Sequence, residues 1–210
     1  MFSREKLRVL AVGAHPDDIE VGCAGTLLKH KSLGDDLVIA ITTQGGYGGR
    51  SWGQIQAEAL KASNVLGTEY IILDNKIGHY EMNWKTVGEL DKIISEHKID
   101  TVYSVWHGDS HQDHRLTFQN VLAACRRKLI QNLYCYELSD YSYRSQDTFN
   151  ARFFVDISDY MDKKIESVKC YKSYITDQHI EAVLGLAKHR GLACGSEYAE
   201  AFEPLFNIWK

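Results

Sequence analysis

The sequence has little proline, no long apolar run and no paired-cysteine motif. Two of its 210 residues are proline, and no uninterrupted apolar stretch approaches the ~18 residues that a membrane-spanning helix needs. The five cysteines are odd in number and widely spaced, without a Cys-x-x-Cys motif. This pattern indicates reduced thiols in a cytoplasmic protein. Residues 1–8 are charged and lack the apolar stretch of a signal peptide, so we expect neither a signal nor a membrane span.

Positive charge is also scarce. The 24 Lys and Arg residues against 28 Asp and Glu residues give a formal net charge of −4. Since phosphate binding needs a basic surface, we expect no nucleic-acid partner. With 44% hydrophobic and 25% charged residues, the chain is neither disordered nor fibrous. We expect one domain over residues 1–210, long enough to bury a full core.

Short apolar runs alternate with segments of helical spacing. Strands are predicted at residues 9–13, 37–42, 70–73, 101–105, 133–138 and 152–157. Helices are predicted at residues 22–33, 54–66, 86–97, 116–130 and 160–176, with one more before the end of the chain. Repeated βα units predict a doubly wound α/β sandwich. In such sheets, sites form at the carboxyl ends of the strands.

Histidine is abundant, with nine residues, and three of them lie between positions 107 and 114. Two polar motifs follow predicted strands: His-Pro-Asp-Asp at residues 15–18 and His-Gln-Asp-His at residues 111–114. His15 and Asp18 are three residues apart, as are His111 and His114, which places each pair on one face of a helical turn. His15, Asp18 and one histidine of the second pair would leave a metal position open to water. This is the pattern of a catalytic zinc site.

The remaining residues of the two motifs supply acid–base chemistry. Asp17, beside Asp18, is placed to act as a general base. The histidine that does not bind metal is placed to stabilise an oxyanion or to protonate a leaving amine. Asp113 is expected to orient one of the histidines between which it lies. Together these parts predict metal-assisted hydrolysis of an amide.

Each motif alone has a plainer interpretation. A single histidine after a strand is usually a surface residue, and an Asp-Asp pair before a helix usually caps it. An isolated His-x-x-His pair is weak support for a metal. The two clusters favour the hydrolase together, because both lie at strand ends and their chemistry is complementary. A dinucleotide site is disfavoured, since the carboxylates at residues 17 and 18 stand where a glycine-rich turn would bind pyrophosphate.

The paired motifs resemble those of the PIG-L/LmbE-like zinc-dependent de-N-acetylases. The similarity extends to residues 22–27, 43–46, 58–67, 155–164 and 197–202. It implies a Rossmann-like three-layer α/β sandwich with a mostly parallel central sheet. It also implies a deacetylase that acts on a linear, non-peptide amide of an N-acetylglucosamine-type conjugate and releases acetate and a free amine.

The same resemblance implies roles for individual residues. The zinc ligands would be His15, Asp18 and His114, Asp17 the general base, and His111 the group that stabilises the oxyanion or acts as acid. Asp113 would tune His111 or His114. Because two histidines and a carboxylate also suit Fe²⁺, Mn²⁺ or Co²⁺, the native metal stays open.

This sequence departs from the family pattern at three places. Ile55 stands where many members have an arginine that helps to hold substrate, and Arg50 is a nearby substitute. Residues 171–174 replace a His-x-Ser-Gln segment, and Gln112 replaces a frequent proline. None of these positions touches the expected metal or base, so the chemistry is better defined than the substrate.

The glycine-rich loop at residues 44–53 is expected to form a lid. Tyr47, Arg50 and Trp52 would bind substrate, because aromatic faces stack on sugars and arginine binds anionic groups. The alternative is a flexible loop with two anchoring aromatics. Asp109 would hold a substrate hydroxyl or the second loop, or cap a turn. For Glu20 we expect an exposed glutamate in a first helical turn, with support of the metal site as the alternative.

Two other functions share these features. One is an amidase acting on a thiol or sugar conjugate with the same metal chemistry. The other is a non-catalytic module that binds a sugar or nucleotide, although a binder has no need for Asp17 beside Asp18. The expected partner is a small amino-sugar. The apolar tail at residues 202–209 would either pack on its own core or form an interface in a homo-oligomer.

Overall fold

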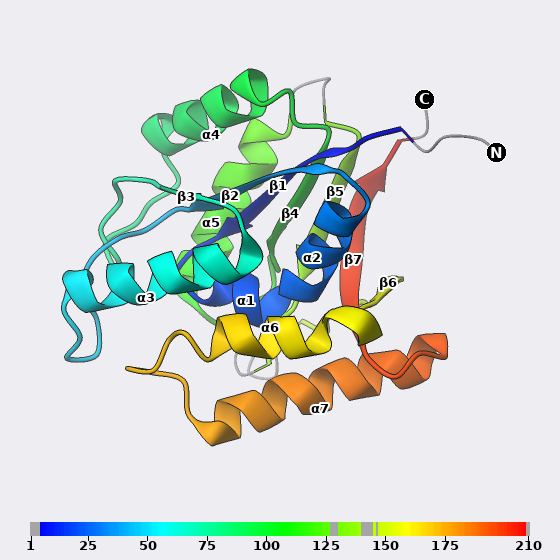
Figure 1. Cartoon of the computed structure of the whole chain (residues 1–210). Coiled ribbons are helices and arrows are strands. Elements are labelled where there is room, and N and C mark those ends of the chain that lie inside the picture. The colour runs from blue at the N-terminus through cyan, green and yellow to red at the C-terminus, as the bar shows by residue number, and fades with distance from the viewer. Residues whose placement is uncertain (1–4, 127–129, 140–144, 146, 209–210) are drawn as a thin grey trace.

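The computed structural model describes residues 5–126, 130–139, 145 and 147–208. Seven strands form one sheet in the order β3-β2-β1-β4-β5-β7-β6 (Figure 1). The neighbouring pairs from β3 to β5 are parallel, and β7 runs antiparallel to both β5 and β6. The strand bounds are β1 Arg8–Gly13, β2 Asp36–Ile41, β3 Tyr70–Ile72, β4 Thr101–Val105, β5 Asn132–Tyr136, β6 Phe153–Asp156 and β7 Ala199–Asn207.

Helices cover both faces of the sheet. The helix bounds are α1 Asp18–Gly22, α2 Ala24–Ser32, α3 Trp52–Leu66, α4 Trp84–Glu96, α5 Gln112–Ala124, α6 Met161–Val168 and α7 Asp177–Cys194, with a 3₁₀ turn at Ser158–Tyr160. In Figure 1, α4 and α5 lie on one side of the sheet, and α1, α2 and α6 lie on the other. The predicted three-layer α/β sandwich with a mostly parallel sheet is therefore confirmed.

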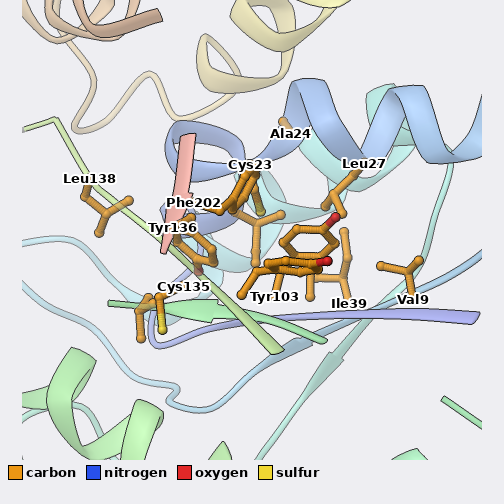
Figure 2. Packing of buried hydrophobic residues seen from close by; sticks show 14 of the residues in the cluster. Val9, Cys23, Ala24, Leu27, Ile39, Tyr103, Cys135, Tyr136, Leu138 and Phe202 are labelled. Carbon is orange, nitrogen blue, oxygen red and sulfur yellow. The ribbon is translucent and has the colours of Figure 1, made fainter. Parts of the chain in front are cut away.

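Alternation along β1 explains the two layers of core. Val9 and Ala11 pack with Leu27 of α2 in one cluster of buried residues, part of which is shown in Figure 2. Leu10 and Val12 point the other way, into the cluster formed with α4 and α5. Successive side chains of a strand face opposite sides, so a continuous apolar run is required when both faces are covered.

The helix predicted at residues 22–33 corresponds to α2, which begins two residues later at Ala24, and a short unpredicted helix, α1, precedes it; the two are separated at Cys23. Glu200 of β7 accepts hydrogen bonds from the backbone N–H groups of Gly25 and Thr26, at 2.9 and 2.7 Å. These bonds satisfy donors that a continuous helix would bond internally. Gly22 permits the break to lie against the sheet, since a Cβ there would meet Tyr136 at 2.2 Å.

The single helix predicted at residues 160–176 is wrong. The structure has α6 ending at Val168, a turn, and α7 beginning at Asp177. Long-range contacts hold the turn: Ser173 donates from its N–H and its hydroxyl to Glu58 of α3, at 2.8 and 2.6 Å. Local periodicity carries no information on such contacts, which here decide where the helix ends.

Two further boundaries differ from expectation. Helix α5 begins at Gln112, four residues before the predicted start at 116, and ends at Ala124; residues 127–129 of the predicted span lie outside the described part of the chain. The apolar tail forms β7, which inserts between β5 and β6 with Phe202 fully buried. The tail thus packs on its own core rather than offering Phe202 to a partner; Trp209 lies outside the described residues. No helix in the described ranges combines the length and apolar character needed to span a membrane.

Candidate functional site

A cavity lies where the carboxyl ends of β1, β2 and β4 meet. Its empty volume is about 610 Å³, including space open to solvent. The loop after β1 and the first residue of α1 supply residues 15–18, and the loop after β2 supplies Thr43, Gln44, Gly45, Tyr47 and Arg50. Trp52 comes from the start of α3, and His111 and His114 come from the start of α5. Of the residues predicted for a site, His15, Asp17, Asp18, Tyr47, Arg50, Trp52, His111 and His114 line this cavity.

Three of these side chains converge as a ligand set would. His15 Nδ1 and His114 Nε2 are 3.3 Å apart. Asp18 places Oδ1 3.4 Å from His114 Nε2 and Oδ2 3.9 Å from His15 Nδ1. Ligand atoms ~2.1 Å from a tetrahedral metal are about 3.4 Å from one another. The contact between the two histidines and the contact of Asp18 Oδ1 with His114 match this spacing, and the 3.9 Å contact with His15 is made by the other oxygen of Asp18.

Neighbouring groups orient each member of this set. Asp18 Oδ2 accepts the backbone N–H groups of Ala14 and His15, at 2.7 and 2.9 Å, which leaves Oδ1 turned toward His114. His15 Nε2 lies 3.2 Å from Asp113 Oδ2. The N–H on the far nitrogen of His15 faces a carboxylate, so its near nitrogen presents a lone pair toward the other two ligand atoms. Such converging electron pairs repel one another unless a cation or protons lie among them.

The pKa values of the two histidines reflect the carboxylates that lie around them. Although burial lowers the pKa of His15, its hydrogen bonds to Asp113 and Asp18 raise it to about 9. Burial also lowers the pKa of His114, but the charge of Asp18 and the nearby Asp109 raise it to about 10. Burial favours neutral Asp18, yet the two histidines hold its pKa well below its usual value. The site therefore attracts positive charge, and a divalent metal would displace these protons on binding.

His111 differs from the other two histidines in its hydrogen bonding. It caps α5, with Nδ1 accepting the backbone N–H of Asp113 at 3.2 Å. Nε2 then carries the proton of the neutral ring. Burial and the neighbouring His114 and His15 lower the pKa of His111 to about 4, so the ring is neutral near pH 7. One ring nitrogen of each of His15, His111 and His114 lies within 4.8 Å of the others, so three histidines form the alternative ligand set.

Asp17 has an unusual backbone. Its φ of 111° lies in the left-handed region, which non-glycine residues rarely adopt. Such a conformation costs roughly 1–3 kcal/mol and is found mostly at functional sites. The Asp17 carbonyl accepts the N–H of Val21 at 2.9 Å and so anchors the start of α1. The strained turn holds the Asp17 side chain on the wall of the cavity, next to the ligand set.

Two predicted residues lie behind the cavity wall instead of on it. The Asp113 carboxylate faces His15, a partner that the sequence did not predict, and its negative charge also acts on His111; it accepts the N–H of Gly78 at 3.1 Å as well. Asp109 is 1% exposed, with Oδ2 3.0 Å from His114 Nδ1 and Oδ1 accepting the N–H of His111 at 2.7 Å. This position does not favour the predicted contact between Asp109 and substrate. Both carboxylates instead lie against the far nitrogens of ligand candidates.

Replacing Asp113 with alanine is expected to weaken metal affinity about 10–100-fold, because the His15 ring then loses the carboxylate that orients it. Metal titration against a competing chelator measures the change. Asp36→Ala, at an exposed position that starts β2, is the matched control and should retain the affinity of the unmodified protein. Equal affinity in the two variants would contradict the orienting role.

Glu20 is a buried component of the site region. Its expected exposure is wrong: the side chain is fully buried. Its Oε1 accepts hydrogen bonds from the hydroxyls of Tyr70 and Tyr171, from β3 and from the turn after α6. Burial raises the pKa of Glu20 to about 7, although the two tyrosines lower it. The Glu20 carboxylate thus links α1, which carries Asp18, to β3 and to the turn after α6. No local sequence pattern predicts these long-range contacts.

Replacing Glu20 with alanine is expected to reduce the free energy of unfolding by about 1–3 kcal/mol, since the buried Tyr171 hydroxyl then lacks its acceptor. Denaturant titration followed by circular dichroism measures the loss. Glu20→Gln keeps an oxygen acceptor and should lose less, and Glu96→Ala on the surface of α4 should lose little. A loss no larger than that of Glu96→Ala would show that the two tyrosines do not depend on Glu20.

The loop after β2 reaches the cavity with Arg50. The Arg50 guanidinium lies 4.7 Å from the centre of the Tyr174 ring, which is also on the wall and was not predicted. Ile55 lines the same cavity, so Arg50 reaches the wall on which the family arginine would stand. Trp52 is not in the loop but is the first residue of α3, which Ser51 caps. Tyr47 is 59% exposed at the cavity mouth.

The chain is similar to known proteins in sequence and in fold. Residues 10–125 match the family model described as PIG-L, GlcNAc-PI de-N-acetylase. The uncharacterized deacetylase YaiS of Escherichia coli is 32% identical over 126 residues, which cover 56% of this chain and 68% of that protein. The diacetylchitobiose deacetylase of Thermococcus kodakarensis is 25% identical over an alignment of 221 residues that covers 92% and 81%. The conserved protein TT1542 from Thermus thermophilus superposes with a TM-score of 0.84 at 25% identity, over 97% of each chain.

Proposed function

Because this chain belongs to the PIG-L family of GlcNAc-PI de-N-acetylases, we propose that it is a metal-dependent hydrolase of an N-acetylglucosamine-type conjugate. It would cleave the N-acetyl group and release acetate and a free amine. The observation that carries this proposal is the convergence of His15, Asp18 and His114 beside Asp17 in one cavity. The free state of all five cysteines supports a cytoplasmic location.

His15, Asp18 and His114 would hold the metal. Zn²⁺ suits this donor set, and Fe²⁺, Mn²⁺ or Co²⁺ would also fit two histidines and a carboxylate. When bound, the metal supplies Lewis-acid activation of the carbonyl and of water. His111 is the weaker candidate for a ligand, because the proton on its Nε2 makes that nitrogen a donor.

The protein groups would then move the protons. Asp17 accepts a proton from the attacking water as that water adds to the carbonyl carbon. Neutral His111 donates a hydrogen bond from Nε2 to the oxyanion that forms. As the C–N bond breaks, the proton held by Asp17 passes to the leaving nitrogen, which departs as the amine; the acyl group leaves as the carboxylic acid and becomes the carboxylate by giving its proton to water or to the amine.

The cavity wall suits a sugar on the amine side of the scissile bond. Trp52 and Tyr47 provide aromatic faces for stacking on a pyranose ring. Arg50 provides hydrogen-bond donors for hydroxyl or anionic groups, and its contact with Tyr174 limits the orientations of the guanidinium. Arg50 would thus replace the arginine that the family has at the position of Ile55.

Acetate release over a substrate panel tests the function. The purified protein, loaded in turn with each of the four metals, is incubated with N-acetylglucosamine, diacetylchitobiose and N-acetylglucosaminyl conjugates. We expect acetate and free amine in equal amounts from at least one of them. Binding of these sugars without acetate release would favour the non-catalytic module. Cleavage confined to thiol-conjugate amides would favour the amidase.

A further inference from the structure

A second, smaller cavity adjoins the first on the side of β5 and α7. Asp17, Asp18 and Tyr174 line both cavities, so the candidate base and one candidate metal ligand stand between them. The empty volume of the second cavity is about 340 Å³, open space included, against about 610 Å³ for the first. The proposed reaction centre therefore has a separate space on each side.

The walls of the two cavities differ in chemistry. Four aliphatic side chains line the second cavity: Val21 of α1, Leu138 after β5, Ile175 before α7 and Val183 of α7. Its other lining residues are Asp17, Asp18, Ser139, Tyr174 and His179. Val183 and Leu138 are 3% and 4% exposed, so this wall is packed and preformed. The first cavity presents arginine, glutamine and threonine side chains together with its aromatic residues. A short hydrocarbon chain would contact the four aliphatic side chains of the second cavity, whereas the first cavity offers a hydroxyl-rich group more hydrogen-bonding side chains.

Tyr174 separates the two spaces. Its ring lies 4.7 Å from the Arg50 guanidinium on the side of the first cavity. It also lies 5.2 Å from the ring of His179, which lines the second cavity. His179 is held in turn at the start of α7, where its Nδ1 accepts the N–H of Thr176 at 3.1 Å. The Tyr174 ring is thus contacted by a side chain from each cavity.

An amide whose carbonyl carbon lies beside Asp17 and Asp18 has one of the two cavities available for each of its substituents. The carbonyl carbon carries the nitrogen on one side and the acyl carbon on the other. With the sugar in the first cavity, the acyl group enters the second. We infer that the second cavity is an acyl subsite and that the enzyme hydrolyses amides of short acyl chains longer than acetyl, such as propanoyl and butanoyl. This inference rests on the proposed function, and water and amide again yield a carboxylate and an amine.

Substitutions at Val183 test the subsite. Release of free glucosamine from N-acetyl-, N-propanoyl- and N-butanoylglucosamine gives kcat/KM for each acyl group. Val183→Phe fills the cavity and is expected to lower the ratio of butanoyl to acetyl kcat/KM by roughly tenfold or more. Val183→Ala enlarges the cavity and should raise that ratio. Val87→Ala, an equally buried valine of α4 in the other core cluster, is the matched control and should leave the ratio unchanged.

Binding to a catalytically inactive variant provides a readout apart from turnover. In Asp17→Asn, calorimetry is expected to show tighter binding of N-butanoylglucosamine than of N-acetylglucosamine. The expected gain in affinity is about fourfold for each additional buried CH₂. One outcome is that N-acetylglucosamine is hydrolysed while the ratio of butanoyl to acetyl kcat/KM is the same in both Val183 variants and in the Val87 control. That result would overturn the acyl subsite and leave the proposed function standing. If none of the three amides is hydrolysed by the unmodified protein while the butanoyl sugar still binds more tightly, the proposed reaction fails and the subsite stands.

Discussion

Replacing Asp17 with asparagine is expected to lower kcat for amide hydrolysis by roughly 10²–10⁴-fold, because an amide oxygen cannot take a proton from the attacking water. The fold should survive, since asparagine is among the few residues that tolerate the left-handed conformation of this position, with φ of 111°. Metal content should also survive, because Asp17 is not one of the three converging donor groups. Steady-state kinetics together with metal analysis of the same sample measures both.

The control for this variant is Asp36→Asn. Asp36 starts β2, and its side chain is 61% exposed, paired with Lys6 at 2.7 Å. The control removes the same charge at a position away from the cavity and should retain the kcat of the unmodified enzyme. If Asp17→Asn hydrolyses the amide as fast as the control, another group is the base, and the role assigned to Asp17 is wrong.

Replacing His114 with alanine is expected to abolish tight metal binding and reduce hydrolysis to the rate of the chelator-treated protein. The side chain is 1% exposed and lies between Asp18 and Asp109. Its removal leaves two buried carboxylates without the cationic partner between them, which is expected to cost about 3–5 kcal/mol of stability. Metal content and thermal unfolding measure the two effects.

Chelation of the unmodified protein separates the metal from the fold. The chelator should remove activity reversibly, and activity should return on addition of the native metal, which a comparison of Zn²⁺, Fe²⁺, Mn²⁺ and Co²⁺ identifies. His97→Ala, at the exposed end of α4, is the matched control and should retain both metal and activity. Unchanged metal stoichiometry in His114→Ala would shift the assignment to a set that contains His111.

The parts of the fold that the sequence predicted well are those set by local patterns. The run at residues 9–13 became β1 within one residue, because a strand covered on both faces needs every side chain apolar. The two motifs lie at strand ends, where loops are free of ladder hydrogen bonds and the sheet places them side by side. Boundaries were less accurate: α5 starts at Gln112 because His111 caps it, and a cap is a single residue that periodicity does not register.

The sequence by itself determined the donor types, their spacing within each motif and their location after predicted strands, whereas the pairing of β1 with β4 that brings residues 15–18 and 111–114 together is a property of the folded sheet. Only the tertiary structure decided which carboxylate faces which histidine, that Glu20 is buried beneath two tyrosines, and that Tyr174 divides two cavities. These contacts join residues far apart in the chain, such as Glu20 and Tyr171. Local periodicity depends on backbone geometry over a few residues. Contacts between residues far apart in the chain depend on how the helices pack against the sheet.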